Sequence, residues 1–410
     1  MKVLYLHQYF STPEGPGGTR SYEMARHLLR RGHQVTMVCA ADERSGLDLP
    51  QNGNGLRHGM VQGIEVYQLP LAYTNRLSLT KRAIIFLRYA LGSLRLASRL
   101  HYDLLYATST PLTAGIPGIV RKLLGSAKPF VFEVRDLWPE LPRAMGVVKN
   151  PLVLGGMSLL EWASYRAATG CIGLSPGIVE GIRKRSRPSL PIEMVPNGCD
   201  LDLFRPGDRS QLDLPGIAPA DFVAAYTGAH GLANGLDAVL AAAAVLKQRA
   251  RKDIKLVLVG EGSQKQRLQS RAKQEGLENV LFIGQIPKLK LCHIVASLDC
   301  GLQVLANVPA FYYGTSPNKF FDYLAGGVPV VNNYPGWLAD LMGKHRCGIA
   351  VPPDDPVALA DALVYLADHS DERRAMGHNA RRLAEMEFAR EQLAGRWVDF
   401  LEQIAAGQPR

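Results

Sequence analysis

Short runs of aliphatic and β-branched residues alternate with longer amphipathic stretches along both halves of the chain. This alternation is typical of βαβ units, in which helices cover a buried parallel sheet. It predicts an α/β fold of two Rossmann-like, doubly wound sheets that face each other across a cleft, with ligands at the carboxyl ends of the strands. The expected strands are Val3–Leu6, Val35–Cys39, Leu104–Ala107, Phe130–Val134, Gly170–Leu174 and Met194–Pro196, then Val223–Thr227, Lys255–Gly260, Val280–Gly284, Cys300–Val304, Val328–Val331 and Gly348–Val351.

A length of 410 residues fits two domains of this kind. Turn-forming residues cluster at Pro196-Asn197-Gly198, so we expect one domain over residues 1–200 and a second over 201–385. One long helix is expected over 371–406, and residues 386–410 are predicted to cross back to the first domain. The first residues are typical of a strand rather than a signal peptide, and no apolar run of about 18 residues predicts a membrane span.

The positive charge is concentrated in the first half. Residues 1–200 hold 24 Lys and Arg against 14 Asp and Glu, whereas the rest of the chain holds 23 of each. Between Val66 and Phe132 there are nine basic residues and a single acid, Asp103. This asymmetry indicates an anionic partner for the first domain, either a lipid surface or a nucleic acid.

Metal binding is not expected. The six cysteines are scattered without a C-x-x-C pair, which favours reduced core residues over a zinc site. Asp200-Leu201-Asp202 has the form of a metal-binding D-x-D motif, but it lies in the turn between the domains, away from any glycine loop.

A glycine-rich turn, Gly15-Pro16-Gly17-Gly18, follows the first strand and precedes a helix expected over 21–31. Backbone N–H groups of Gly17 and Gly18 can approach a phosphate, and the start of the next helix favours negative charge. The turn is not G-x-G-x-x-G and no suitably placed acid follows, so a dinucleotide site is not favoured. A tight turn without a ligand is the alternative.

Two acids and an arginine lie at the carboxyl end of a predicted strand: Glu133, Arg135 and Asp136. Alternation along the strand places Glu133 and Arg135 on one face and Asp136 at the exit. Either carboxylate can bind an acceptor hydroxyl or take its proton. The alternative is a structural Arg–Asp pair that caps the next element.

A third cluster predicts a nucleotide site in the second half. A polar loop containing Thr315 and Ser316 leads through Pro317 into a helix that includes Asn318. The first-turn N–H groups can receive a diphosphate, and Lys319 adds a positive charge there. Asp322 lies one turn further along, where a carboxylate can hold two ribose hydroxyls. Glycine loops at Gly228 and Gly260 end two other strands, and Lys265 is a candidate for neutralising the diphosphate. A solvated amphipathic helix is the alternative.

These motifs, in this order, resemble the retaining glycosyltransferases of family 4, which have the two-domain GT-B fold. The resemblance rests on Gly17-Gly18, Gly32-His33-x-Val35, Pro196-Asn197-Gly198, Phe204-x-Pro206 and the segment Asp322–Val330. Within the family the chain is most similar to bacterial transferases of surface polysaccharides such as O-antigen and capsule, some of which use UDP-linked N-acetyl-L-fucosamine.

The resemblance implies that Asp322 takes the place of the family's second glutamate, which binds ribose. Gly314 stands where the first glutamate is usual, so the donor-sugar contact is assigned to backbone N–H groups of Thr315 and Ser316. The family's phosphate-binding Arg and Lys would fall at Ala229 and Asn234, and Lys265 and Lys319 are the expected replacements. Arg135-Asp136 stands where His-Asp is usual. The resemblance also implies retention at the anomeric carbon, with no cofactor and no metal.

The positive charge of the first half of the chain is the basis for the expected acceptor. On a helix expected near residues 80–100, four basic residues fall within about 40° of one another, with apolar residues at the flanks. They are Lys81, Arg88, Arg95 and Arg99. We expect a cytoplasmic enzyme held peripherally at the inner face of the cell membrane, acting on a polyprenyl-diphosphate-linked glycan. A solvated face of an ordinary helix is the alternative.

Two other functional classes stay open. A nucleotide-sugar epimerase of similar two-domain design would turn over the donor without an acceptor. The charge would also suit a nucleic-acid-binding protein, but no such motif occurs, and no nucleic-acid partner is expected.

Overall fold

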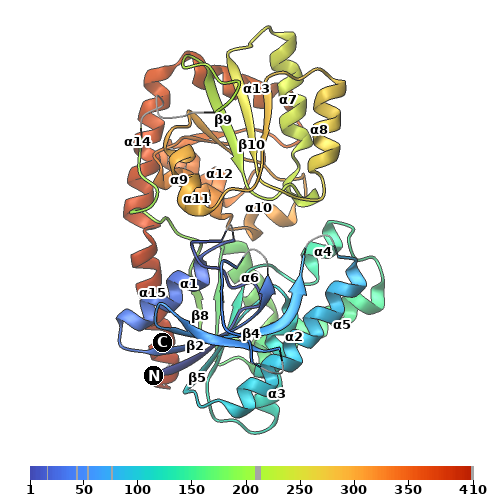
Figure 1. The fold of residues 1–410 in the computed structure, drawn as a ribbon, viewed down its shortest axis with the longest axis vertical. Helices are drawn as coiled ribbons and strands as arrows, with labels where there is room; N and C mark the ends of the chain where they lie inside the picture. Colours follow the sequence, from blue (N-terminus) through green and yellow to red (C-terminus); the bar gives the residue numbers. More distant parts are fainter. Residues whose placement is uncertain (16, 43–44, 53–54, 75–76, 208–213, 408–410) are drawn as a thin grey trace. The chain divides into compact units, whose positions relative to one another are not determined.

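The computed structural model describes residues 1–15, 17–42, 45–52, 55–74, 77–207 and 214–407. The chain divides into two compact units (Figure 1). Unit 1 comprises Met1–Pro196, Tyr313–Ser316 and Glu391–Arg410, and unit 2 comprises Asn197–Tyr312 and Pro317–Arg390. Each unit contains one sheet with helices packed against it, as the alternating sequence pattern predicts.

Unit 1 contains an eight-stranded sheet in the order β3-β4-β2-β1-β5-β6-β7-β8, parallel except for the pair β3 and β4. Its order reverses between β1 and β5, which brings the carboxyl ends of these two strands together at a switch point. The strands are β1 Lys2–Leu6, β2 Gln34–Asp42, β3 Arg57–Val61, β4 Ile64–Tyr73, β5 Leu104–Thr108, β6 Phe130–Val134, β7 Gly170–Gly173 and β8 Ile192–Met194.

The helices of unit 1 cover both faces of this sheet. In Figure 1, α2, α3 and α5 lie together, and α1 and α15 lie toward the other side. The α1 and α15 pair is joined by ion pairs from Arg30 to Glu391 and from Arg31 to Asp399. The helices are α1 Arg20–Arg30, α2 Leu79–Arg99, α3 Ile116–Leu123, α4 Glu140–Ala144, α5 Pro151–Ala167, α6 Pro176–Arg185 and α15 Arg390–Ala405.

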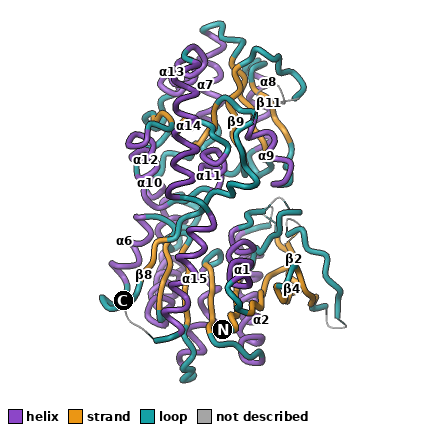
Figure 2. Tube along the Cα trace, turned by 90° about the vertical axis from the view of Figure 1, so that its left-hand side faces the viewer, coloured by secondary structure: helices purple, strands orange, loops and turns teal. Residues whose placement is uncertain are grey.

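The hairpin of β3 and β4 is absent from the sequence prediction. Its turn is Gln62-Gly63, and both residues have positive φ, as a two-residue hairpin turn requires. β4 then pairs in parallel with β2 and runs beside it (Figure 2). The Gln-Gly pair is a weaker hairpin signal than Asn-Gly or Asp-Gly, which explains why the strand pattern around it was missed.

Unit 2 contains a six-stranded, fully parallel sheet in the order β11-β10-β9-β12-β13-β14. Its switch point lies between β9 and β12. The strands are β9 Phe222–Thr227, β10 Ile254–Val259, β11 Val280–Ile283, β12 Cys300–Gln303, β13 Val330–Asn332 and β14 Gly348–Ala350. The helices are α7 Asp237–Gln248, α8 Lys265–Gln274, α9 Lys288–Ala296, α10 Ala310–Gly314, α11 Asn318–Ala325, α12 Trp337–His345, α13 Pro356–Asp368 and α14 Ser370–Glu387.

The prediction of one helix over 371–406 is wrong. The chain forms α14 and α15, with a two-residue break at Phe388-Ala389. There Cys199 donates its N–H to the Phe388 carbonyl, and Arg390 donates its N–H to the Cys199 carbonyl. These two bonds form a short parallel bridge, and it takes backbone groups that a continuous helix would use internally.

Helix α15 belongs to unit 1 from Glu391 onward. Trp397 is fully buried and donates its indole N–H to the Tyr106 hydroxyl at 2.9 Å, and Gly170 lies against Phe400 and Ile404. The chain therefore returns to the first sheet at its end. All six cysteines are buried and unbridged, and no helix among the described residues has the length and apolarity needed to cross a bilayer.

Candidate active site

Two glycines end the central strands of unit 2 at the same edge of the sheet. Gly228 follows β9 with φ of +149°, and Gly260 follows β10 with φ of +142°. A Cβ atom on Gly260 would overlap the carbonyl oxygen of Gly228. The two loops therefore touch through bare backbone at the carboxyl edge, and the N–H groups of Gly228 and Gly260 themselves donate to the carbonyls of Val259 and Ile283.

Gly260→Ala is expected to lower the free energy of unfolding by about 2 kcal/mol or more, because it adds both the overlap and an unfavourable positive φ. Gly343→Ala is the matched control, because a Cβ there meets nothing within 4 Å and lies inside helix α12. Differential scanning calorimetry of both variants measures the change. A melting temperature of Gly260→Ala equal to that of Gly343→Ala would contradict this account of the loop.

Helix α11 carries the predicted nucleotide residues and is fixed to β9 through Tyr323. The Tyr323 hydroxyl receives the Thr227 N–H at 2.9 Å and donates to the Ala225 carbonyl at 2.9 Å. Its ring lies against Gly301 of β12, where a side chain would clash. The buried tyrosine thus sets the position of the first part of the helix, Asn318–Asp322, relative to the strand ends.

Lys319, in the first turn of α11, lies beside Gly228. The Cβ position of Gly228 is 3.1 Å from Lys319 Cε, and the ammonium group lies 4.6 Å from the centre of the Tyr226 ring. Burial lowers the pKa of Lys319 to about 8, although the negative charge of Asp322 opposes the shift. The structure therefore brings together two of the predicted donor-binding residues, Gly228 and Lys319.

Asp322 is buried in a cluster of charged groups. Its Oδ1 lies 3.8 Å from Lys288 Nζ and has no hydrogen-bond partner among the described residues. Lys288 and Arg390 both bind Asp200, and Lys288 thus joins the two carboxylates. Burial raises the pKa of Asp322 to about 6, with Asp200 adding to the shift and Lys288 and Arg390 opposing it. A buried carboxylate with an unused oxygen is suited to accept ligand hydroxyl groups.

Lys288 was missed by the sequence prediction. It is the first residue of α9 and follows β11, so it arrives at the same edge as Gly228 and Gly260. The position of Lys288 in the segment directly after a parallel strand was the signal that could have found it. Asp200 of the D-x-D sequence is committed to its ion pairs with Lys288 and Arg390, and Asp202 is fully exposed.

The other predicted donor residues lie in different surroundings. Lys265 bonds to the carbonyls of Gly260 and Ile283 and to the Glu261 carboxylate, so all three of its donors are occupied by the protein. Asn318 begins α11. Thr315 and Ser316 are half-buried and are grouped with unit 1.

Glu133 forms a buried ion pair in unit 1. Arg20 donates to Glu133 Oε2 from Nη2 at 2.8 Å and from Nε at 3.1 Å, and Thr108 donates to Oε1 at 2.8 Å. Arg20 also donates to the carbonyls of Val195 and Pro196. Burial raises the pKa of Glu133, but the positive charge and hydrogen bonds of Arg20 outweigh it and hold the pKa at about 2. Glu133 is fully enclosed, which makes it a structural carboxylate.

Asp136 lies beyond the strand and is partly exposed. It accepts a hydrogen bond from Thr110 at 3.3 Å, and Arg135 donates its backbone N–H to Ser109 at 2.9 Å. Burial raises the pKa of Asp136, and the positive charge of Arg135 opposes that shift. Of the two predicted acids, Asp136 is therefore the one that a ligand can reach.

His7 and Gln8 directly follow β1 at the same edge, and the sequence prediction missed both. Both are buried, and His7 Nδ1 and both polar atoms of the Gln8 side chain have no partner among the described residues. Burial lowers the pKa of His7 to about 3, with Arg135 contributing. Their place at the end of the first strand was the signal that could have found them.

Gly17 is half-buried and Gly18 is exposed, and they precede Thr19 at the N-terminus of α1. Pro16 of that turn lies outside the described residues. The basic residues predicted on α2 are all exposed: Lys81, Arg88, Arg95 and Arg99.

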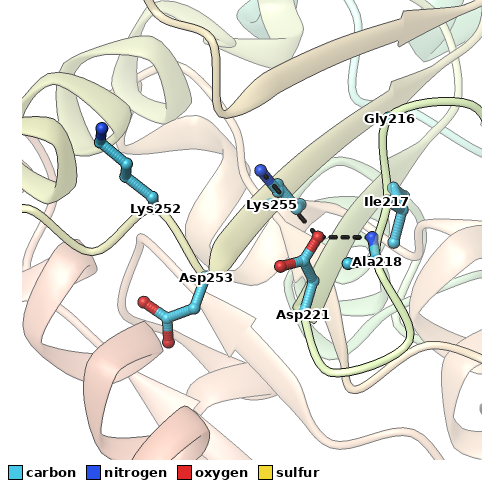
Figure 3. A pocket seen from close by; sticks show the side chains of 7 residues that line it. All are labelled: Gly216, Ile217, Ala218, Asp221, Lys252, Asp253 and Lys255. Atoms are coloured by element: carbon cyan, nitrogen blue, oxygen red, sulfur yellow. Dashed lines mark hydrogen bonds and ion pairs between the residues drawn. The ribbon is translucent and has the colours of Figure 1, made fainter.

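A surface pocket of unit 2 lies at the other edge of the sheet (Figure 3). Asp221 accepts the Ala218 N–H at 2.7 Å and lies 3.9 Å from Lys255. This pocket is next to Phe222 and Ile254, where β9 and β10 begin. It is therefore separate from the carboxyl edge that holds Gly228 and Lys319. It is lined by Gly216, Ile217, Ala218, Asp221, Lys252, Asp253 and Lys255.

The two sheets define the class of the protein. Sucrose-phosphate synthase from Thermosynechococcus elongatus superposes with a TM-score of 0.77 at 19% identity, over 99% of this chain and 100% of that one. HepE of Anabaena, solved in complex with UDP, superposes with a TM-score of 0.67 at 18% identity, over 98% of this chain and 100% of that one. The chain has the GT-B fold, as predicted.

The family follows from two sequence models. "Glycosyl transferase 4-like domain" matches residues 15–198 and "Glycosyl transferases group 1" matches residues 214–383. Together they cover most of the chain, which belongs to the family 4 glycosyltransferases. The prediction of an enzyme of the glycosyltransferase class is confirmed at this level.

Three curated relatives are similar in sequence. D-inositol 3-phosphate glycosyltransferase of Nocardia farcinica is 30% identical, over 46% of this chain and 42% of that protein, so less than half of its length is matched. An α-1,4-N-acetyl-D-galactosaminyltransferase of Campylobacter jejuni, named for an undecaprenol-linked acceptor, is 22% identical over 40% of this chain and 44% of that protein. WcaI of Escherichia coli, whose name assigns it provisionally to colanic acid biosynthesis, is 24% identical over 72% of this chain and 76% of that protein.

Proposed function

We propose that this enzyme transfers a sugar, with retention, from a UDP-sugar to a polyprenyl-diphosphate-linked glycan in surface polysaccharide synthesis. The observation that carries the proposal is the arrangement at the carboxyl edge of unit 2. There the first turn of α11, with its N–H groups and the Lys319 ammonium, lies beside the glycine loop that ends β9, and the same helix carries the unpartnered Asp322 oxygen. These groups match the parts of a nucleoside diphosphate: N–H groups and a cation for the phosphates, and a carboxylate for ribose.

Departure of the diphosphate is the step that this edge assists. The breaking bond leaves negative charge on the β-phosphate, and Lys319 with the first N–H groups of α11 is placed to stabilise that charge. Burial leaves Lys319 with a pKa of about 8, so it is still mainly protonated at neutral pH. We propose that this arrangement needs no metal ion.

The acceptor side is assigned to unit 1. His7 and Gln8 follow β1 and Asp136 follows β6, two strands on either side of β5, and they offer one reachable carboxylate and buried polar atoms without a partner among the described residues. Asp136 is proposed to hold the acceptor hydroxyl. Support for a lipid-linked glycan comes from the name of the Campylobacter relative and from the exposed basic residues of α2. The proposed place of the enzyme is the cytoplasmic face of the membrane.

Calorimetric titration with UDP, GDP and ADP, with and without EDTA, tests the donor assignment. We expect UDP to bind most tightly, EDTA to leave the affinity unchanged, and Lys319→Met to weaken binding about tenfold or more by removing a charge-assisted contact. Lys344→Met on α12 is the matched control. UDP-N-acetylated deoxyhexosamines are then the first donors to screen.

The same experiment can overturn the proposal. If no nucleotide binds, or if Lys319→Met binds UDP as the wild type does, the donor site is assigned wrongly. Turnover of the sugar nucleotide without any acceptor would instead indicate an epimerase.

A further inference from the structure

We propose that the outer face of helix α5 inserts into the headgroup region of an anionic bilayer. The outer face is defined by Leu152, Gly155, Gly156, Leu159 and Trp162. This inference rests on the proposed function in one respect, because a lipid-linked acceptor requires the enzyme to work at a membrane.

Helix α5 lacks the polar side that a surface helix normally has. Between Pro151 and Tyr165 its only charged side chain is Glu161, and that residue points inward. Glu161 is buried, pairs with Arg185, and accepts hydrogen bonds from the Trp138 N–H and the Tyr165 hydroxyl. The polar groups of α5 are thus used to fix the helix to unit 1.

The opposite side of α5 exposes large apolar groups. Leu152 is 84% exposed, Leu159 is 63% exposed and Trp162 is 46% exposed. Gly155 and Gly156 lie between them, and nothing comes within 4 Å of their Cβ positions. These residues recur at helical spacing, so they form one continuous stripe. A stripe of this kind without charged residues is typical of a surface that has a partner.

The stripe continues onto neighbouring helices. Helix α3 packs against both α2 and α5, and the three lie together in Figure 1. Leu123 and Leu124 at the end of α3 are strongly exposed, and so are Ile84, Leu87 and Leu91 of α2. Of the large exposed hydrophobic side chains among the described residues, more than half lie between Ile84 and Trp162. The exposed apolar surface is therefore concentrated on one layer of unit 1.

The charges around the stripe favour a lipid surface over a second copy of the chain. Helices α2 and α3 contain no acidic residue, and their exposed basic residues include Lys81, Arg88 and Lys122. Arg143 and Lys149 precede α5, and Arg166 follows its apolar stripe. In a two-fold dimer this face would meet its own positive charge, whereas anionic lipid neutralises it.

The dimensions also suit a helix that lies in the plane of the interface. Seventeen residues make a helix of about 25 Å, and its single apolar stripe can enter the headgroup boundary while Glu161 stays within the protein. Trp162 is at the edge of that stripe, where an amphipathic ring is favoured at a membrane–water boundary.

Trp162 itself reports the contact. The tryptophan fluorescence of the protein is measured with vesicles of phosphatidylcholine alone and with vesicles containing about one-third phosphatidylglycerol. The measured quantities are the emission wavelength and the quenching of the fluorescence by lipids brominated near the headgroup. We expect a blue shift and quenching on the anionic vesicles only, and loss of this signal in Trp162→Phe, which still sediments with them.

The variant Leu152→Glu/Leu159→Glu is expected to weaken vesicle binding about 100-fold. The variant loses the burial of two leucine side chains in the bilayer, and its two added carboxylates are repelled by the anionic lipid. Met386→Glu on α14 is the control, because it adds an acid at another exposed apolar position and is expected to bind like the wild type. Circular dichroism and melting curves check that both variants are folded.

Three results would overturn the inference: no emission change on anionic vesicles, vesicle binding by the double variant equal to the wild type, or a wild-type dimer that the double variant dissociates. The dimer would identify a second copy as the partner. UDP titration of the same samples separates this inference from the proposed function. Vesicle binding without UDP binding would contradict the proposed transferase function and support the membrane contact. UDP binding without vesicle binding would support the proposed donor site and contradict the membrane contact.

Discussion

Replacing Glu133 with glutamine is expected to lower the free energy of unfolding by about 3 kcal/mol, because it leaves the buried guanidinium of Arg20 without its counter-charge. Arg20 is as deeply buried as Glu133, so in the variant its positive charge stays out of water without a counter-charge. Urea denaturation at neutral pH measures the change. Glu180→Gln, at an exposed pair with Lys184, is the control and is expected to cost less than about 0.5 kcal/mol.

The pH dependence of this difference has a definite sign. Folding lowers the pKa of Glu133 from 4.5 to about 2, so the ionised form is favoured in the folded state. Its contribution is complete above pH 4.5 and is lost as the pH falls toward 2. The stability gap between wild type and Glu133→Gln should therefore narrow over that interval. A small loss of stability with a large loss of kcat would contradict the structural role and return Glu133 to the position of general base.

With Glu133 in a structural role, Asp136 is the acid that we propose to hold the acceptor hydroxyl. The sequence places both acids at one strand end and cannot separate them, because burial depends on residues far along the chain. Arg20 comes from α1, more than a hundred positions earlier, and closes over Glu133. Asp136, beyond the end of the strand, remains partly exposed. Which of these two acids a ligand can reach therefore depends on tertiary contacts that the local sequence does not show.

Most of the parallel strands were predictable because they are short, nearly continuous apolar runs, and the central ones, such as β5, β6 and β9, are buried on both faces. Predicted Phe130–Val134 corresponds to β6, and predicted Val223–Thr227 corresponds to β9 apart from one residue. The hairpin of β3 and β4 was missed because its pattern is weak and its turn is Gln-Gly. The break before α15 was missed because its cause is a pairing with Cys199, nearly two hundred residues earlier.

At the carboxyl edge of unit 2, where we propose that the donor binds, local features were again predictable from sequence and tertiary contacts were not. Gly228, Lys319 and Asp322 were predicted from local motifs, since a glycine at a strand end and a polar helix start are visible in sequence. Lys288 was not identified, because its relation to Asp322 exists only through the packing of α9 against α11. Lys265 has the right position in the sequence, yet the protein itself uses its hydrogen-bond donors. Ion pairs of this kind have no fixed spacing along the chain.

Asp322→Asn is expected to weaken UDP binding about 30-fold while making the protein more stable at alkaline pH. The loss of affinity follows from replacing a charged acceptor of ribose hydroxyl groups by a neutral amide. The gain in stability follows from burial, which raises the pKa of Asp322 from 3.8 to about 6. A raised pKa means that its favourable contribution is present below pH 3.8 and is lost as the pH rises through 6. Between pH 4 and pH 8 the variant should gain about 2–3 kcal/mol relative to the wild type.

Calorimetric UDP titrations and urea denaturation curves at several pH values measure both effects on the same preparation. Wild-type affinity for UDP should fall as the pH drops through about 6, where Asp322 takes up a proton, and the affinity of Asp322→Asn should lack that step. Asp202→Asn makes the same chemical change at a fully exposed position and is expected to alter neither property. Unchanged UDP affinity in Asp322→Asn would place the ribose elsewhere. Lower stability of the variant at pH 8 would show instead that the carboxylate is needed to hold Lys288, because a buried cation without its partner costs more than the buried acid.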